Sequence, residues 1–328
     1  MSNRNRPATA QGIETATAWA PASLSNLGPG FDCLGLAIDG WGDTVQASPG
    51  EIGSVRVRFH PESAWNGTTA PKRNTAAVAA QAVLRKLEVN GGIDLVIHKG
   101  IAPGSGAGSS AASAAAAAWA VNLMKGAPLT RSECVSAVLE GEAVASDARH
   151  GDNAVPALLG GLVVVSAADP GEYRRFIPEP APTIAVVLPD VEILTRDARA
   201  LLPGVVSLRS SVENAASLGM LIMAIRDGDW RAAGRQMMSD RIVEPLRARL
   251  IPEYGAIQAA ALEAGAFGCA LSGSGPAMFA VAESDRAGDR VLAAMMSVLQ
   301  SAGREAKAIR TTIDCQGARS ADFSTDHA

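Results

Sequence analysis

Aromatic residues and cysteines are scarce in this sequence. Phe, Trp and Tyr together make up 4% of the 328 residues, so we expect a core built mainly from Ala, Val, Leu and Ile. The four cysteines are far apart in the chain, at positions 33, 134, 269 and 315. This spacing excludes a C-x-x-C pair and argues against a disulfide framework or a zinc site. Isolated thiols are typical of buried cysteines in a reducing compartment, so we expect a cytoplasmic protein.

The sequence also lacks an excess of basic residues and a long apolar run. Its net charge is −4 and its isoelectric point is about 5.7, whereas non-specific nucleic-acid binding needs a clustered basic face. The longest apolar run, residues 111–124, is too short and too rich in alanine to cross a bilayer. Residues 1–12 are polar and have no hydrophobic signal-peptide core. We therefore expect neither nucleic acid nor membrane as a partner, and flexible tails at 1–13 and 316–328.

Glycine, alanine and serine are concentrated in residues 102–112, which read A-P-G-S-G-A-G-S-S-A-A. The three glycines let the backbone adopt positive φ and approach a ligand closely. The alanines that follow favour a helix, whose first N–H groups and positive dipole end would face the loop and suit a polyphosphate. The order matches neither a P-loop, which needs a lysine after the last glycine, nor the Rossmann spacing. A flexible linker is the alternative, but the position between an apolar strand and a helix favours a phosphate-binding loop.

Two polar clusters lie in turns. Asn26 and Asp32 belong to the turn-rich segment 23–32, where either could simply hydrogen-bond to its own backbone. Residues His150–Asn153 gather an imidazole, a carboxylate and an amide directly after a predicted helix. A lone histidine is more often structural, but a polar cluster just before a buried strand favours a ligand site.

Three charged side chains elsewhere, and a second glycine-rich turn, each have a structural and a functional interpretation. Glu142, on the helix before His150, is either a solubilising residue or a hard oxygen ligand for the Mg²⁺ that accompanies ATP. Arg199 and Arg247 are either surface residues or bidentate donors to a carboxylate. A second glycine-rich turn, residues 271–276, is either a simple loop or a second wall of the phosphate site.

The order of the expected elements indicates an α+β protein with two lobes. Strands and helices are mixed without strict βαβ alternation, which disfavours a doubly wound sheet. Segment 169–182, rich in proline and acidic residues, is the best candidate for a linker. The expected strands are 15–20, 31–38, 44–47, 55–59, 93–98, 161–167, 183–188 and 305–313, with a strand–turn unit over 268–281. The expected helices are 74–87, 111–119, 130–146, 212–226, 230–239, 252–263 and 286–301, the third beginning with a Thr130–Glu133 capping box.

Three segments resemble, in the same order, the motifs of the GHMP kinases, the superfamily named after galactokinase, homoserine kinase, mevalonate kinase and phosphomevalonate kinase. They are residues 21–35, 103–113 and 270–278, and together they span nearly the whole chain. Within the superfamily the sequence is most similar to the homoserine kinases, through Asn26 with Gly30–Asp32, His150–Asn153, Pro189, Thr195–Arg199, Glu244–Arg247 and Pro252. Two departures are Ala107, where the family usually has leucine, and Pro103, which stands one place later than in many relatives. Both keep the glycines.

The resemblance implies a fold and a nucleotide site. The N-terminal lobe, residues 14–172, would resemble the second domain of ribosomal protein S5, and the C-terminal lobe, residues 173–315, a ferredoxin-like domain. ATP would lie in the cleft between them, and Ser110 and Glu142 would hold Mg²⁺. The nucleotide-binding residues implied by the resemblance are Asn74, Ala102, Pro103, Gly104, Ser105, Gly106, Ala107, Gly108, Ser109, Ser110, Ala111 and Ala112.

The resemblance also implies an acceptor site for L-homoserine. The two arginines suit its carboxylate, and Asp32 suits its ammonium group. The implied substrate-binding residues are Asn26, Asp32, His150, Asp152, Arg199, Arg247 and Ser272. The implied catalytic residues are Asn26, Asp32, Asn153 and Arg199.

The implied reaction is transfer of the γ-phosphoryl group of ATP to the homoserine hydroxyl, on the way to threonine. Positioning and charge neutralisation carry most of such catalysis. Mevalonate kinases use an aspartate as base near the place of Asn153, so we expect direct transfer with the proton passing to a phosphate oxygen. Two alternatives stay open: a kinase for mevalonate or shikimate, which have no ammonium group to face Asp32, and a non-enzymatic metabolite-binding member, which would be expected to have a degraded glycine loop. Relatives are often dimers, so the resemblance implies a homodimer.

Overall fold

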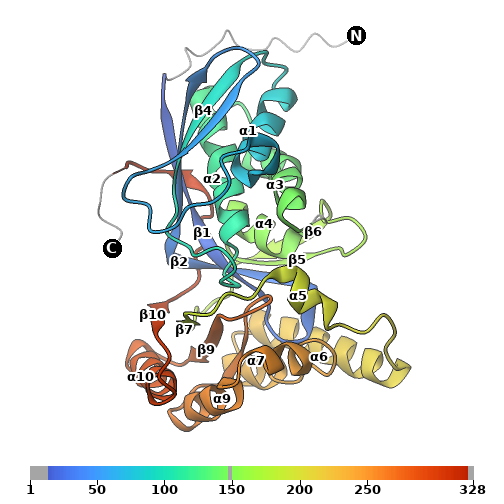
Figure 1. Ribbon diagram of the computed structural model, residues 1–328. Helices are drawn as coiled ribbons and strands as arrows, with labels where there is room; N and C mark the ends of the chain where they lie inside the picture. Colours follow the sequence, from blue (N-terminus) through green and yellow to red (C-terminus); the bar gives the residue numbers. More distant parts are fainter. Residues whose placement is uncertain (1–13, 147–149, 324–328) are drawn as a thin grey trace.

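The computed structural model describes residues 14–146 and 150–323 and has two lobes, each with its own β-sheet (Figure 1). The N-terminal sheet has the order β11-β1-β2-β4-β3, with β5 paired to β2 and β6 paired to β5. Its strands are β1 Ala16–Asn26, β2 Gly30–Gly50, β3 Val55–Phe59, β4 Gly92–His98, β5 Leu162–Val165, β6 Tyr173–Phe176 and β11 Arg319–Ser320. No helix of the described ranges is long and apolar enough to cross a membrane.

The first two strands form a long antiparallel hairpin that supports the rest of the lobe. β2 runs continuously over the two segments 31–38 and 44–47, which were expected to be separate strands. The pairing with β1 continues across this region through a register shift between Pro21 and Ala22, so the strand bends instead of ending. One half of β2 then pairs with β5 and the other half with β4.

Four helices cover one face of this sheet (Figure 1). They are α1 Thr75–Lys86, α2 Ser109–Met124, α3 Arg131–Ser146 and α4 Gly151–Leu159, and a 3₁₀ turn over Pro71–Arg73 precedes α1. Helix α2 is buried along almost its whole length, which its small alanine side chains permit by letting α1, α3 and the sheet approach closely. Helix α3 begins with the predicted capping box, in which Thr130 N donates to Glu133 Oε2 over 2.8 Å.

The C-terminal lobe has a four-stranded antiparallel sheet of order β10-β7-β9-β8. Counted along the chain this is 4-1-3-2 with helices after the first and third strands, the topology of a ferredoxin-like domain. The strands are β7 Thr183–Pro189, β8 Gly268–Leu271, β9 Met278–Ala282 and β10 Ala306–Thr311. The helices are α5 Thr195–Ala200, α6 Leu208–Arg226, α7 Trp230–Met237, α8 Glu244–Arg247, α9 Tyr254–Glu263 and α10 Asp285–Ser301, with a 3₁₀ turn over Ala248–Leu250.

The N-terminal sheet extends beyond the expected lobe boundaries. Strand β6 lies in the expected linker and beyond residue 172, yet it pairs with β5. Strand β11 lies in the expected C-terminal tail, yet it pairs with β1, and Ala318 beside it is fully buried. Arg131 Nε donates to the Ala318 carbonyl over 2.6 Å, which fixes this segment on α3. The described part of the tail is therefore a packed edge of the N-terminal lobe.

Candidate active site

A cavity of about 1020 Å³ is lined by residues of both lobes. Its N-terminal wall includes the glycine-rich loop and the starts of α1, α2 and α4, and its C-terminal wall includes α5 and Arg247 of α8. This volume is at the upper end of the usual range for small-molecule sites, enough for a nucleotide and a small acceptor together.

The three glycines of the loop all have positive φ, +71° at Gly104, +77° at Gly106 and +69° at Gly108. Close packing of protein atoms explains two of them. A Cβ atom at Gly106 would lie 2.5 Å from the Ser272 carbonyl oxygen, and one at Gly108 would lie 2.2 Å from Ser23 Oγ. The loop is therefore packed between β1 and the second glycine-rich turn, while its remaining surface faces the cavity.

The predicted nucleotide contacts divide into two groups. Seven loop residues line the cavity: Pro103, Gly104, Ser105, Gly106, Gly108, Ser109 and Ser110. The side chains of Ala102, Ala107, Ala111 and Ala112 instead pack into hydrophobic clusters, so these side chains would not form the predicted contacts with the nucleotide. Only backbone atoms remain available at these four positions. The N–H groups of the first turn of α2 have no acceptors within that helix, as at any helix start.

Asn74 also lines the cavity, at the start of α1. Its Oδ1 accepts from Ala77 N over 3.0 Å and its Nδ2 donates to the Thr68 carbonyl over 2.8 Å. The side chain thus caps α1 and holds the preceding segment against it. Its polar atoms are already used within the protein.

Ser110 and Glu142 form an oxygen-rich pair on the wall of the cavity. Ser110 Oγ lies 3.0 and 2.9 Å from the two carboxylate oxygens of Glu142. Burial raises the pKa of Glu142 to about 8, partly offset by the Ser110 hydroxyl. A carboxylate and a hydroxyl are hard donors of the kind Mg²⁺ prefers, and phosphate oxygens would have to complete its coordination. The donor set therefore fits a Mg²⁺ ion that arrives with a nucleotide.

Asp32, which also lines the cavity, forms an ion pair with Arg199. Arg199 Nη2 lies 2.9 Å from each carboxylate oxygen of Asp32, and His150 Nδ1 is 3.7 Å from Asp32 Oδ1. Burial lowers the pKa of His150, and Arg199 and Arg247 lower it further although Asp32 opposes them. These surroundings together favour the neutral form of the imidazole.

Arg247 reaches the same place from α8. It is 3% exposed, its Nη1 donates to the Gly273 carbonyl over 2.7 Å, and its buried Nε has no partner among the described residues. The guanidinium groups of Arg247 and Arg199 lie 5.0 and 5.2 Å from the ring centre of Phe31. Two cationic groups from the C-terminal lobe therefore converge beside Asp32 of the N-terminal lobe.

Asp152 and Asn153, at the start of α4, line the cavity next to each other. Asp152 is 3% exposed and its Oδ1 has no hydrogen-bond partner among the described residues. Burial, and next the nearby charge of Asp32, raises the pKa of Asp152 to about 7. Asn153 Oδ1 accepts from Ser23 Oγ over 2.9 Å, which fixes the amide beside the glycine loop.

Two further predicted acceptor residues connect the lobes. Asn26, at φ +69°, donates from Nδ2 to the Gly273 carbonyl over 3.1 Å, and its Oδ1 accepts from Asp32 N over 3.3 Å. Ser272 is fully buried, and its hydroxyl donates to the Gly106 carbonyl over 2.6 Å. Ser272 does not line the cavity, so the expectation that it contacts the acceptor is not supported. Its role is to tie the two glycine-rich segments together.

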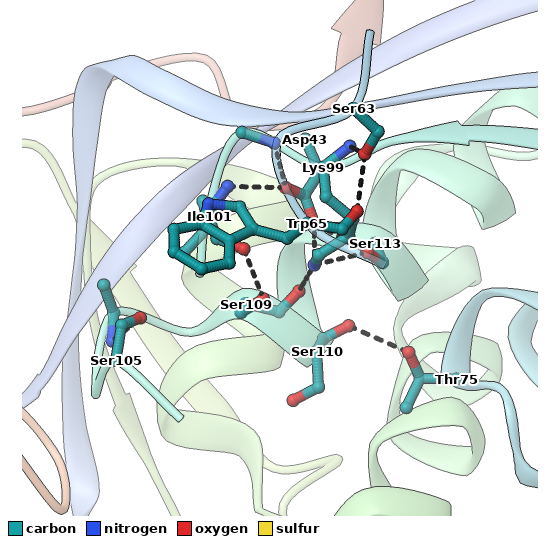
Figure 2. A network of polar contacts seen from close by, with 12 residues as sticks. Asp43, Ser63, Trp65, Thr75, Lys99, Ile101, Ser105, Ser109, Ser110 and Ser113 are labelled. Atoms are coloured by element: carbon teal, nitrogen blue, oxygen red, sulfur yellow. Dashed lines mark hydrogen bonds and ion pairs between the residues drawn. The ribbon is translucent and has the colours of Figure 1, made fainter. Parts of the chain in front are cut away.

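Sequence reasoning missed a buried network beneath the loop (Figure 2). Asp43 and Lys99 form an ion pair there, and Ser113 bonds to both. Lys99 also lines the cavity. The available signal was a lone lysine directly after an apolar strand and directly before the glycine-rich segment.

The comparisons with known proteins agree with this architecture. The profile described as "GHMP kinases N terminal domain" matches residues 74–161, and the one described as "GHMP kinases C terminal" matches residues 221–299. The fold is also found among solved structures. The structure of L. major mevalonate kinase in complex with R-mevalonate superposes with a TM-score of 0.73 at 19% identity, and the match covers 94% of this chain and 99% of that one. The chain belongs to the GHMP kinases.

Comparison with individual relatives assigns the chain to one family within the GHMP kinases. Homoserine kinase of Arabidopsis thaliana is 41% identical over 87% of this chain and 78% of its own length. That of Pyrococcus furiosus is 38% identical over 88% of this chain and 94% of its own. The crystal structure of homoserine kinase from Cytophaga hutchinsonii superposes with a TM-score of 0.89 at 32% identity, covering 94% and 98%. Within the GHMP kinases, the chain is a member of the homoserine kinase family.

Proposed function

We propose that this protein transfers the γ-phosphoryl group of ATP to the side-chain hydroxyl of L-homoserine, giving O-phospho-L-homoserine. One observation carries the proposal. Asp32 and two arginines converge in one part of the wall of a cavity, and the glycine-rich loop and the start of α2 form another part of the same wall. Paired charges of both signs suit an amino acid, and the loop suits a polyphosphate.

The part of the cavity formed by the glycine-rich loop, here called the nucleotide end, positions the triphosphate of ATP. The triphosphate lies along residues 103–110, where the first N–H groups of α2 and the positive end of its dipole face the phosphates. Ser110 Oγ and Glu142 would hold the Mg²⁺ that neutralises phosphate charge when ATP is bound. The hydroxyl of Ser109 donates to the Ile101 carbonyl over 2.9 Å and therefore serves the loop itself.

The part of the cavity formed by Asp32, Arg199 and Arg247, here called the acceptor end, recognises the charged groups of homoserine. Arg199 uses only Nη2 on Asp32, so its other N–H groups remain able to bind the substrate carboxylate together with Arg247. Asp32 accepts the ammonium group while it keeps Arg199 in place. Substrate binding thus extends the Asp32–Arg199 ion pair into a larger alternating arrangement of charges.

Direct transfer accounts for the proton. The family resemblance matches Asn153 with the basic aspartate of mevalonate kinases, and a carboxamide cannot accept a proton at neutral pH. The homoserine hydroxyl then attacks the γ-phosphorus, the bond to the β-phosphate oxygen breaks, and the proton passes to an oxygen of the transferred group. The loose transition state of phosphoryl transfer makes a strong base unnecessary.

The alternatives to this function are phosphorylation of mevalonate or shikimate, and metabolite binding without turnover. A coupled assay of ADP release with L-homoserine, mevalonate, shikimate or no acceptor distinguishes all three. We expect turnover with homoserine alone. Turnover with another acceptor would contradict the substrate assignment, and ATP binding without any turnover would contradict the kinase assignment.

We also propose a homodimer in the cytoplasm. Exposed apolar side chains along and before α6, among them Val205, Leu208 and Met220, support self-association. Sedimentation of the wild type and of a Met220→Glu variant tests it: the wild type should sediment as a dimer. The four cysteines support the cytoplasmic location, because all four are free, as is usual for cysteines in a reducing compartment.

A further inference from the structure

A lysine in the cavity wall has its donors occupied by the protein (Figure 2). Lys99 follows β4 directly, and its side chain is 8% exposed. Its ammonium group forms an ion pair with Asp43 and donates to the Ser109 carbonyl over 2.8 Å and to Ser113 Oγ over 2.9 Å. An ammonium group has three N–H donors, so none is left for a ligand.

The carboxylate of the pair is equally engaged. Asp43, on β2, has a fully buried side chain. Its Oδ1 accepts from Gly100 N over 3.0 Å and from Ile101 N over 3.1 Å. Its Oδ2 accepts from Ser113 Oγ over 2.6 Å and contacts Lys99. Both charges of this network are therefore paired and hydrogen-bonded.

These contacts hold both ends of the glycine-rich loop. Asp43 fixes the entry through two backbone N–H groups, and Lys99 fixes the exit through the Ser109 carbonyl in the first turn of α2. The hydroxyl of Ser109 closes the arrangement by donating to the Ile101 carbonyl. One buried ion pair therefore sets the distance between the start of the loop and the start of the helix.

We infer that Asp43 and Lys99 are positioning residues that hold the loop ready for the triphosphate, and that Lys99 is not itself a phosphate ligand. This inference rests on the proposed function, in which the loop binds the phosphates of ATP. A buried ion pair adds little net stability compared with apolar side chains of the same volume. Its value here lies in fixing the direction of the first N–H groups of α2 before the nucleotide arrives.

The two roles of Lys99 predict opposite effects of Asp43→Asn. If Lys99 bound phosphate, removing the neighbouring negative charge would free the ammonium group and strengthen ATP binding. If the pair positions the loop, the amide turns an N–H donor toward Lys99 or toward the backbone N–H groups, and the loop loses an anchor. We expect the affinity for Mg-ATP to fall roughly tenfold or more.

Titration of the wild type and Asp43→Asn with Mg-ATP and with adenosine, monitored by calorimetry, tests the inference. Adenosine has no phosphate, so its affinity should stay near the wild-type value, as should the KM for homoserine. Asp39→Asn is the matched control: it is the same change on the same strand, but at a half-exposed ion pair with Arg319. It should leave all three constants unchanged.

The results of these titrations either support the positioning role of the ion pair or overturn it. Equal or tighter Mg-ATP binding by Asp43→Asn, or an equal loss for adenosine and homoserine, overturns the inference. A wild type that fails to bind Mg-ATP contradicts the proposed function and this inference with it. Should Asp43→Asn not fold, Ser113→Ala replaces it, with an expected loss of roughly three- to tenfold for Mg-ATP and none for adenosine.

Discussion

Three charged side chains discussed above are buried beside the cavity, where they lose most of their hydration. Glu142, Asp152 and Arg247 are at most 7% exposed, and all three line the cavity. Burial raises the pKa of both carboxyl groups, so their ionised forms are costly until a cation approaches. Positive charge would stabilise both carboxylates: in the proposed function Mg²⁺ brings it to Glu142, and the ammonium group of homoserine brings it close to Asp152.

Replacing Glu142 by Gln should lower kcat by more than tenfold while the KM for homoserine changes little, because a metal ligand loses its charge and the acceptor end is untouched. Steady-state kinetics at saturating Mg²⁺ measures this. Glu140→Gln is the matched control, since Glu140 lies on the same helix in an exposed ion pair with Arg85. Near-normal turnover by Glu142→Gln would exclude the metal role.

Asp152→Asn tests whether the reaction uses a base. Because we propose direct transfer, kcat should stay within about tenfold of the wild type, whereas loss of a general base typically reduces the rate by about 10²–10⁴-fold. The KM for homoserine should rise, because a buried carboxylate is lost from the acceptor end. A fall in kcat beyond about 10²-fold with an unchanged KM would show that Asp152 takes the proton.

At the scale of elements, the glycine-rich loop is held from three sides. It contacts β1, the network around Lys99, and the second glycine-rich turn of the C-terminal lobe. The Ser23 N–H donates to the Ala107 carbonyl over 3.2 Å, and the Ala277 N–H donates to the Ser105 carbonyl over 3.0 Å. The loop therefore serves as a joint between lobes as well as a wall of the cavity.

Gly106→Ala tests this double role. The new Cβ would lie 2.5 Å from the Ser272 carbonyl oxygen and would also be held at φ +77°. Gly53→Ala is the control, because Gly53 has a similar φ of +78° and nothing within 4 Å of its Cβ position. We expect Gly106→Ala to unfold at a clearly lower temperature than Gly53→Ala and to bind ATP more weakly. Equal thermal midpoints for the two variants would mean that the loop can shift to accommodate the new methyl group without a loss of stability.

The sequence predicts an element well when its signal lies within the element itself. It predicts an element poorly when its bounds depend on pairing with another strand. Strand β3 and the capping box of α3 agree with the prediction because period-two alternation and a Thr–Glu pair are local signals. The union of 31–38 and 44–47 into β2 depends on the bulge opposite Pro21, and β11 exists only because β1 offers an edge. Likewise, the resemblance assigned Asp32 and Arg199 to one site and the structure pairs them. It could not show that Ser272 is enclosed, because burial is set by the contact between the lobes.

At the scale of the whole molecule, the acceptor end is assembled from both lobes. Asp32 and His150 belong to the N-terminal lobe, whereas Arg199 and Arg247 belong to the C-terminal lobe. Arg247 sits on the short helix α8, which begins at the buried Glu244. Glu244 Oε1 accepts from Tyr254 Oη over 2.7 Å and from Leu271 N over 2.9 Å, so it fastens α8 to α9 and β8.

The stability of the whole chain should depend on the protonation of Glu244. Burial raises its pKa to about 7, against about 4.3 in an unfolded chain. The folded protein thus retains a proton that the unfolded chain releases, so this contribution to stability is present below about pH 4 and is lost as pH rises to 7. Glu244→Gln lacks this dependence but can keep both hydrogen bonds.

Urea unfolding of the wild type and Glu244→Gln at pH 5 and pH 8 measures the effect. The stability of the wild type relative to the variant should fall by on the order of 2 kcal/mol between these pH values. Other titrating groups are common to both proteins and cancel in the difference. A difference that does not change with pH would mean that Glu244 is ionised throughout in the folded protein.

The central claim is that charges from two lobes together recognise an amino acid. The most direct test compares L-homoserine with 3-aminopropan-1-ol, which has the same hydroxyl and amine but no carboxylate, as acceptors for the wild type, Arg247→Ala and the exposed control Arg209→Ala. For Arg247→Ala we expect kcat/KM for homoserine to fall roughly 10²-fold, with little change for the amino alcohol. Arg209→Ala should retain wild-type preference. If Arg247→Ala discriminates between the two acceptors as well as the wild type does, or loses activity equally on both, the carboxylate is not bound by this arginine and the account of the acceptor site is wrong.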